Sequence, residues 1–108
     1  MQVGSVIRTL RSAAGLSQQA FARQLEITAS YLSLIEHSRR EPTVRLLRRM
    51  AAVLGAPAAV LFAAALVTEG SGHVGQAERK IVEHLVESVR MTMLLDRAIP
   101  NRTDVHNG

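Results

Sequence analysis

Two short segments, residues 17–25 and 28–37, carry the clearest chemical signal in this sequence. Only residues 26–27 separate them, and so short a connection forces two helices to cross steeply. The second helix then projects its outer side chains away from the body, in a shape that fits the major groove of duplex DNA. Arg39 and Arg40 follow at once, where guanidinium groups would bind phosphates beside that groove.

The distribution of charge predicts an anionic partner for the first part of the chain. The 108 residues carry a net charge of +4. Residues 1–67 contain eight arginines and three glutamates, whereas residues 68–108 contain five basic and six acidic side chains. A basic segment joined to a nearly neutral one indicates a polyanion as partner of the basic part. Charge alone fits DNA, RNA and an anionic membrane surface equally well.

Residues that could support catalysis or metal binding form no recognisable site. The absence of cysteine excludes a disulfide framework, a thiolate metal site and a cysteine nucleophile. Residues 70–75 match the pattern G-x-G-x-x-G, but an alanine-rich helix is expected before them, where a dinucleotide site requires a strand. The histidines lack metal-ligand spacing and lie at His37, His73, His84 and His106. We therefore predict a protein that is not an enzyme and needs no metal or cofactor.

An uncharged run at residues 50–67 is long enough to be considered as a membrane span. Gly55 and Pro57 interrupt it, and about half of it is alanine, which gains little from lipid. Two short buried helices explain the run better. The first residues have no charged start followed by an apolar core, so we expect no secretory signal, a cytoplasmic location and no membrane partner.

Short helices with clear boundaries are expected along the first two-thirds of the chain. Apolar residues recur there at spacings of three and four, and no stretch alternates with a period of two, so the fold class is all-α. Helix starts are indicated at Ser17, Thr28, Pro42-Thr43 and in a first turn containing Pro57, and helix ends at Gly15 and Gly55.

The composition changes after residue 67. Residues 68–73 predict a flexible linker, residues 74–99 a long helix, and residues 100–108 a disordered polar tail. The long helix has too many apolar side chains for a free solvated rod, and those that most need a covering surface are Ile81, Leu85, Val89 and Leu95. They would either fold back on their own domain or meet a second copy of the chain.

An ordered set of residues runs through roughly residues 4–64 without a gap in register. It consists of Leu16-Ser17-Gln18-Gln19, Phe21-Ala22, Leu25, Tyr31-Leu32-Ser33, Ile35-Glu36, Pro42, Leu47 and Leu54-Gly55. Together these residues resemble the lambda-repressor-like, or Xre/Cro-type, helix-turn-helix family. The resemblance implies a five-helix lambda-repressor-like DNA-binding domain in residues 1–67, with the third helix as recognition helix, here followed by a long C-terminal helix. It also implies that dimers bind operators in double-stranded DNA.

The same resemblance implies roles for individual side chains. The positions that face bases hold Ala29, Ser30, Ser33 and Leu34. Gln18 and Gln19 begin the second helix and would contact phosphate or brace the recognition helix. The expected phosphate contacts are Gln18, Gln19, Tyr31, Arg39, Arg40, Thr43 and Arg45, although Tyr31 could instead pack and Arg45 could instead be solvated. Arg11 and Glu36 match a partly buried ion pair that ties the first helix to the third.

Three features depart from the family pattern. Glu26 stands where the turn commonly has a left-handed glycine, a conformation that costs other residues roughly 1–2 kcal/mol. His37-Ser38 replaces the usual Asn-Gly. Ala29 and Leu34 replace side chains that are often polar or basic, so these two positions offer apolar contact with thymine methyl groups instead of hydrogen bonds to purines.

Two functional classes follow. The first is a transcriptional regulator, most simply a homodimeric repressor held together through residues 74–99. Dimerisation would place two recognition helices about one DNA turn apart, roughly 34 Å. The second is an interaction protein, such as an antitoxin or a regulator whose last helix binds another protein.

Overall fold

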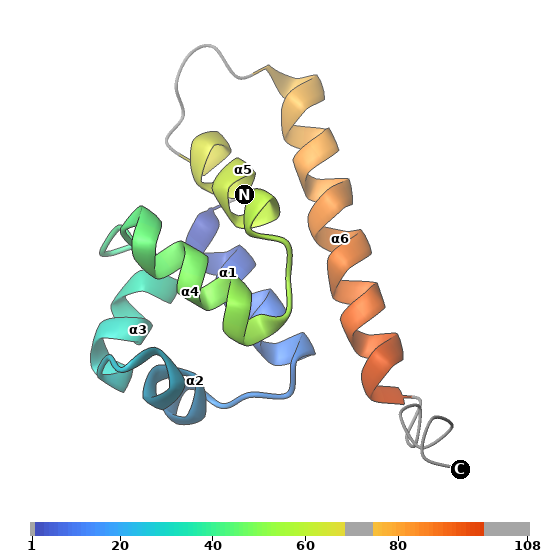
Figure 1. The fold of residues 1–108 in the computed structure, drawn as a ribbon. Helices are drawn as coiled ribbons and strands as arrows, with labels where there is room; N and C mark the ends of the chain where they lie inside the picture. Colours follow the sequence, from blue (N-terminus) through green and yellow to red (C-terminus); the bar gives the residue numbers. More distant parts are fainter. Residues whose placement is uncertain (1, 69–74, 99–108) are drawn as a thin grey trace.

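The computed structural model describes residues 2–68 and 75–98, which form α-helices and no strand (Figure 1). The helices are α1 (Val3–Ala13), α2 (Gln18–Leu25), α3 (Ala29–Glu36), α4 (Val44–Leu54), α5 (Ala58–Thr68) and α6 (Gln76–Ala98). The predicted all-α class, with short helices followed by one long helix, is confirmed. The predicted linker, residues 68–73, begins too early, because Thr68 is the last residue of α5; residues 69–73 and the predicted tail, residues 100–108, lie outside the described residues. The long helix, predicted for residues 74–99, begins at Gln76 after the non-helical Gly75.

Helix boundaries are set by the short-range signals that the sequence contains. The hydroxyls of Ser17, Thr28 and Thr43 each accept a hydrogen bond of 3.0 Å from the backbone amide three residues later. Such caps satisfy amides that a helix start leaves unpaired. Gly15 and Gly55 adopt φ angles of +77° and +71°, in the left-handed region that ends a helix most easily at glycine. Pro57 was expected in the first turn of a helix but lies just before it, because α5 begins one residue later.

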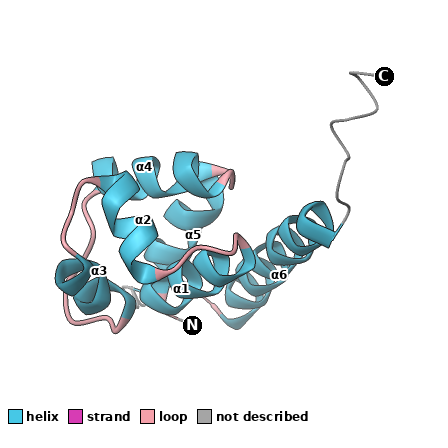
Figure 2. Cartoon of the chain, turned by 90° about the horizontal axis from the view of Figure 1, so that it is seen from below, coloured by secondary structure: helices cyan, strands magenta, loops and turns pink. Residues whose placement is uncertain are grey.

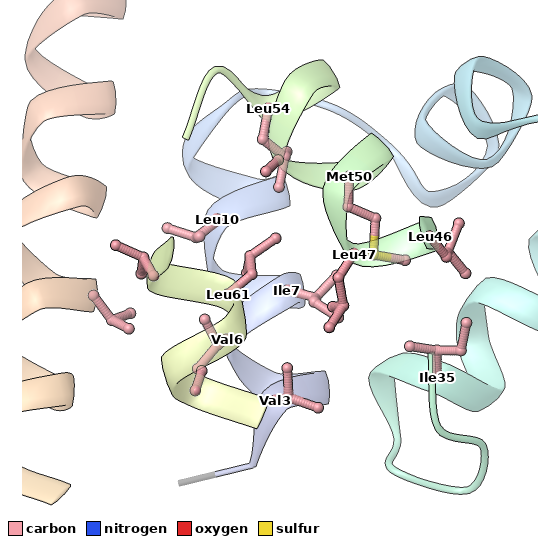
Figure 3. Packing of buried hydrophobic residues seen from close by; sticks show 14 of the residues in the cluster. Val3, Val6, Ile7, Leu10, Ile35, Leu46, Leu47, Met50, Leu54 and Leu61 are labelled. Atoms are coloured by element: carbon pink, nitrogen blue, oxygen red, sulfur yellow. The ribbon is translucent and has the colours of Figure 1, made fainter. Parts of the chain in front are cut away.

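The core is formed by apolar side chains from α1 to α5. Figure 3 shows members from α1, α3, α4 and α5. The largest fully buried members of the core are Ile7, Leu10, Phe21, Leu25, Leu32, Ile35, Met50 and Leu61. Complete burial of one such side chain contributes about 1.5–3 kcal/mol. Because α2 and α3 each supply two of these residues, hydrophobic burial holds this helix pair against α1 and α4.

The long helix α6 packs along α1 and α5, on the side of the domain away from α3 (Figures 1 and 2). Its side chains Val82, Val86 and Met93 are buried in the same core. Arg79 Nη1 donates to the carbonyl of Val67 at 3.2 Å, at the end of α5. Arg97 Nη1 donates to the carbonyl of Ala13 at 3.1 Å, at the end of α1. Both arginines thus satisfy carbonyls that a helix C-terminus leaves unpaired.

The uncharged run at residues 50–67 falls into α4 and α5, with the break at Gly55 as expected. Within residues 2–68 and 75–98, no helix is both long and apolar enough to cross a bilayer.

Candidate nucleic-acid interface

A tight turn positions α3 against α2. Glu26 takes the left-handed conformation expected there, with φ 60° and ψ 39°. The amide of Ile27 then donates to the carbonyl of Ala22 at 3.0 Å, which closes the end of α2. Ala22 is buried where the two helices approach each other. Arg49 of α4 donates to Glu26 Oε2 at 3.0 Å on the exposed side of the turn.

The outer face of α3 carries the four residues expected to face bases. Ser30 and Leu34 are exposed, with 38% of Leu34 accessible, whereas Ala29 and Ser33 are half-buried. Leu32 and Ile35, on the opposite face, are fully buried. The exposed face therefore offers small hydroxyl groups and one apolar side chain, which suit adaptable hydrogen bonds to base edges and contact with a thymine methyl group.

A buried carboxylate links the three helices around this face. Arg11 of α1 donates from Nε to Glu36 Oε2 at 2.7 Å and from Nη2 to Oε1 at 3.1 Å. Gln18 Nε2 of α2 donates to the same Oε1 at 3.0 Å. The Glu36 side chain is inaccessible and that of Arg11 is 12% exposed, so the charge is buried but fully hydrogen-bonded. Gln18 of α2 is thus hydrogen-bonded to the last residue of α3.

Gly4 of α1 allows the close approach of α1 to the end of α3. A Cβ atom at this position would lie 2.3 Å from the carbonyl oxygen of Ile35 and 2.8 Å from that of Glu36. Both distances are far below van der Waals contact, and the obstructing atoms belong to the backbone. The sequence alone gives no sign of this position, because nothing in it shows which backbone passes beside a helical glycine.

The residues expected to contact phosphate lie on α2, on α3, in the loop that follows α3 and at the start of α4. Gln19, Arg39, Arg40, Thr43 and Arg45 are exposed, and Tyr31 is half-buried and packed against the core. Ser38 turns the chain after α3 through a left-handed conformation with φ 61°. Among the described residues, no ion pair engages Arg39, Arg40 or Arg45, so no neighbouring carboxylate neutralises these arginines.

The residues expected at a dimer interface are divided between two faces of α6. Ile81, Leu85 and Leu95 are 59%, 46% and 57% exposed. Val89 is half-buried against the core. On the solvent side of the same helix, hydrogen bonds from Arg90 lower the pKa of Glu87. The hydrogen bonds to Glu87 in turn raise the pKa of Arg90. The single chain therefore folds α6 back on its own domain and still leaves these three large apolar side chains, and Met91 at 46%, exposed.

Known proteins resemble the part of the chain that contains this interface. A family model described as a helix-turn-helix domain matches residues 2–64. The chain is 50% identical over 56 residues to the HTH-type transcriptional regulator RamB of Mycobacterium tuberculosis, in strains CDC 1551 / Oshkosh and ATCC 25618 / H37Rv. The match covers 52% of this chain but only 12% of each relative. No solved structure matches the chain significantly.

Proposed function

We propose that this chain binds double-stranded DNA sequence-specifically, regulates transcription and is located in the cytoplasm. It belongs to the helix-turn-helix domain family through residues 2–64. Within that family we assign it to the lambda-repressor-like type and infer that it acts most simply as a homodimeric repressor. The observation that carries the proposal is the exposed outer face of α3, which Arg11 and Gln18 hold from the inner side through Glu36. The arginines that follow α3 form no ion pair among the described residues.

Binding would divide its contacts between base edges and phosphates. Ser30, Ser33 and Leu34 would enter the major groove, because the N-terminal residues of a recognition helix reach the bases. Arg39 and Arg40 would bind the phosphates beside the groove and so fix the register of the protein on the duplex. A dimer bound across a promoter would exclude polymerase, which is the simplest route to repression.

The proposed homodimer uses the uncovered row on α6 formed by Ile81, Leu85 and Leu95. At 3.6 residues per turn, this row is centred about 120° around the helix from the buried seam of Val82, Val86 and Met93. An antiparallel pair of α6 helices in contact through the row has its two-fold axis perpendicular both to α6 and to the line that joins the two helices. Because the row faces about a third of a turn away from the seam, the direction from α6 to its own domain lies closer to that axis than to the line between the helices. Both recognition helices would then face the same side, as binding to one DNA site requires.

An alternative is that the row on α6 binds a different protein, as in an antitoxin or a partner-controlled regulator. The same three exposed side chains favour this reading. Sedimentation of the purified protein separates the two readings, since only the first predicts a dimer in the absence of other proteins.

Protection of DNA upstream of the chain's own gene tests the proposed function. We expect a discrete protected site that survives an excess of unrelated duplex DNA. The matched variant Ser30→Ala removes one base-facing hydroxyl and is expected to weaken protection of that site while leaving binding to unrelated DNA unchanged. Uniform protection along the whole fragment would contradict sequence-specific binding.

A further inference from the structure

His37 lies directly after α3, and its ring is fixed by the last turn of that helix. Nδ1 lies 2.8 Å from the carbonyl oxygen of Ser33 and 3.4 Å from the Ser33 hydroxyl. The residue is exposed, on the outward side of the chain between the face of α3 and Arg39. It was not among the DNA contacts expected from the sequence.

The contact with Ser33 determines which nitrogen carries a proton. A carbonyl oxygen only accepts hydrogen bonds, so Nδ1 must be the donor at 2.8 Å. In the neutral ring, Nε2 is then a hydrogen-bond acceptor. In the protonated ring, Nε2 becomes a donor and the ring carries a positive charge. The outward nitrogen of His37 therefore offers a donor only when the ring has taken up a second proton.

Among the described residues, the charged side chains around His37 leave its ring without an ion pair. The carbonyl end of α3 carries a partial negative charge, and the last turn of α3 contains no basic residue to offset it. On the inner side, the Glu36 carboxylate is occupied by Arg11 and Gln18. Arg39, Arg40 and Glu41 follow in the loop. None of the described charged side chains forms a hydrogen bond or ion pair with His37.

We propose that His37 is a proton-linked contact to a DNA phosphate, an inference that rests on the proposed function. The base-facing residues occupy α3 from Ala29 to Leu34, and the arginines expected on phosphates follow the helix. His37 therefore lies between the part of the chain expected in the groove and the part expected on the DNA backbone. A phosphate oxygen only accepts hydrogen bonds, and Nδ1 is committed to Ser33. Contact with phosphate therefore requires the cationic ring, which takes its second proton from solvent as DNA binds.

The sign of the pH dependence follows from this requirement. A phosphate oxygen can accept from the charged ring but not from the neutral one, so binding to DNA takes up a proton. Affinity for DNA therefore rises as pH falls. We expect affinity to rise several-fold per protomer between pH 8 and pH 6.

The test measures the dissociation constant of the full chain for its protected DNA site from pH 6 to pH 8 at fixed salt. We expect His37→Gln to lose the rise in affinity at low pH. His37→Arg, which is always charged, is expected to bind at pH 8 about as tightly as the wild type does at pH 6. His84→Gln is the matched control, because His84 is an exposed histidine on α6. It should keep the wild-type pH dependence.

The possible outcomes distinguish this inference from the proposed function. A His37→Gln variant with the wild-type pH dependence would overturn the contact while leaving DNA binding intact. Affinity that increases with pH and loses this dependence in His37→Gln would also overturn it, since the ring would then accept from a base. No binding to any specific site at any pH would overturn the proposed function itself, and the contact with it.

Discussion

Arg11 Nε lies 2.7 Å from Glu36 Oε2, and this ion pair joins α1 to the last residue of α3. The inaccessible Glu36 carboxylate also accepts from Gln18 of α2. The orientation of α3 is therefore set by two other helices through one buried charge. Such a charge is costly in isolation and is tolerated because its oxygens are fully hydrogen-bonded.

Removal of the cation should destabilise the domain strongly. Arg11→Met leaves the Glu36 carboxylate buried without its partner, and we expect unfolding in urea to require about 3 kcal/mol less free energy than in the wild type. Arg8→Met is the matched control, because Arg8 is exposed on the same helix and forms no ion pair among the described residues. Its effect should stay within about 0.5 kcal/mol. Equal stabilities for the two variants would show that the pair does not hold α3.

The close contact at Gly4 leads to a second prediction for the packing of α1 against α3. Gly4→Ala places a methyl group against the carbonyls of Ile35 and Glu36, so α1 and α3 must separate. Overpacking of this kind costs about 1–3 kcal/mol, and we expect weaker DNA binding as well, because the displaced helix is α3. Thermal unfolding and binding to the protected site measure both effects. Ser5→Ala, at an exposed neighbouring position, should change neither, and an unaffected Gly4→Ala would contradict the argument.

Much of the fold could be predicted from the sequence, because the signals that begin and end its helices are local. Ser17 and Thr28 begin helices through bonds to amides three residues away, and Gly15 and Gly55 end helices through their own φ angles. The docking of α6 was not predictable. Apolar residues occupy two faces of that helix, and periodicity cannot tell which face covers the domain.

Only the part of the candidate site that follows a family sequence pattern could be predicted. The family resemblance indicated Arg11, Glu36 and the outer residues of α3. The need for glycine at position 4 depends on the path of a distant backbone, and the state of the His37 ring depends on the geometry of the Ser33 carbonyl. Neither is visible before the helices are placed.

Substitutions of the arginines and of the base-facing residues should change DNA binding in different ways. Arg39→Ala and Arg40→Ala should weaken binding to all duplexes alike, and each should reduce the slope of log affinity against log salt by about 0.9. Leu34→Ala should leave the salt slope unchanged and alter the preferred bases. Titration of specific and unrelated duplexes at several salt concentrations separates the two effects. An arginine variant that changed base preference without changing the slope would reverse these assignments.

The uncovered row on α6 should control assembly. Leu85→Asp places a charge within the row but outside the buried seam, so we expect a folded monomer by sedimentation velocity. Loss of the second recognition helix should weaken binding to the DNA site about 100-fold. Gln76→Asp, at an exposed position at the start of α6, should remain dimeric and bind as the wild type does. If Leu85→Asp remained a dimer, the interface would lie on another surface, for instance around the exposed Leu66 on α5.

Selection of binding sites from a random library of duplex DNA tests the central claim most directly. The proposed function predicts enrichment of one two-fold symmetric motif, with half-sites about 10 base pairs apart. It also predicts that the motif selected by Leu34→Ala differs at the base that this side chain contacts. A selected pool with no motif beyond that of the input library would contradict sequence-specific recognition of DNA by α3.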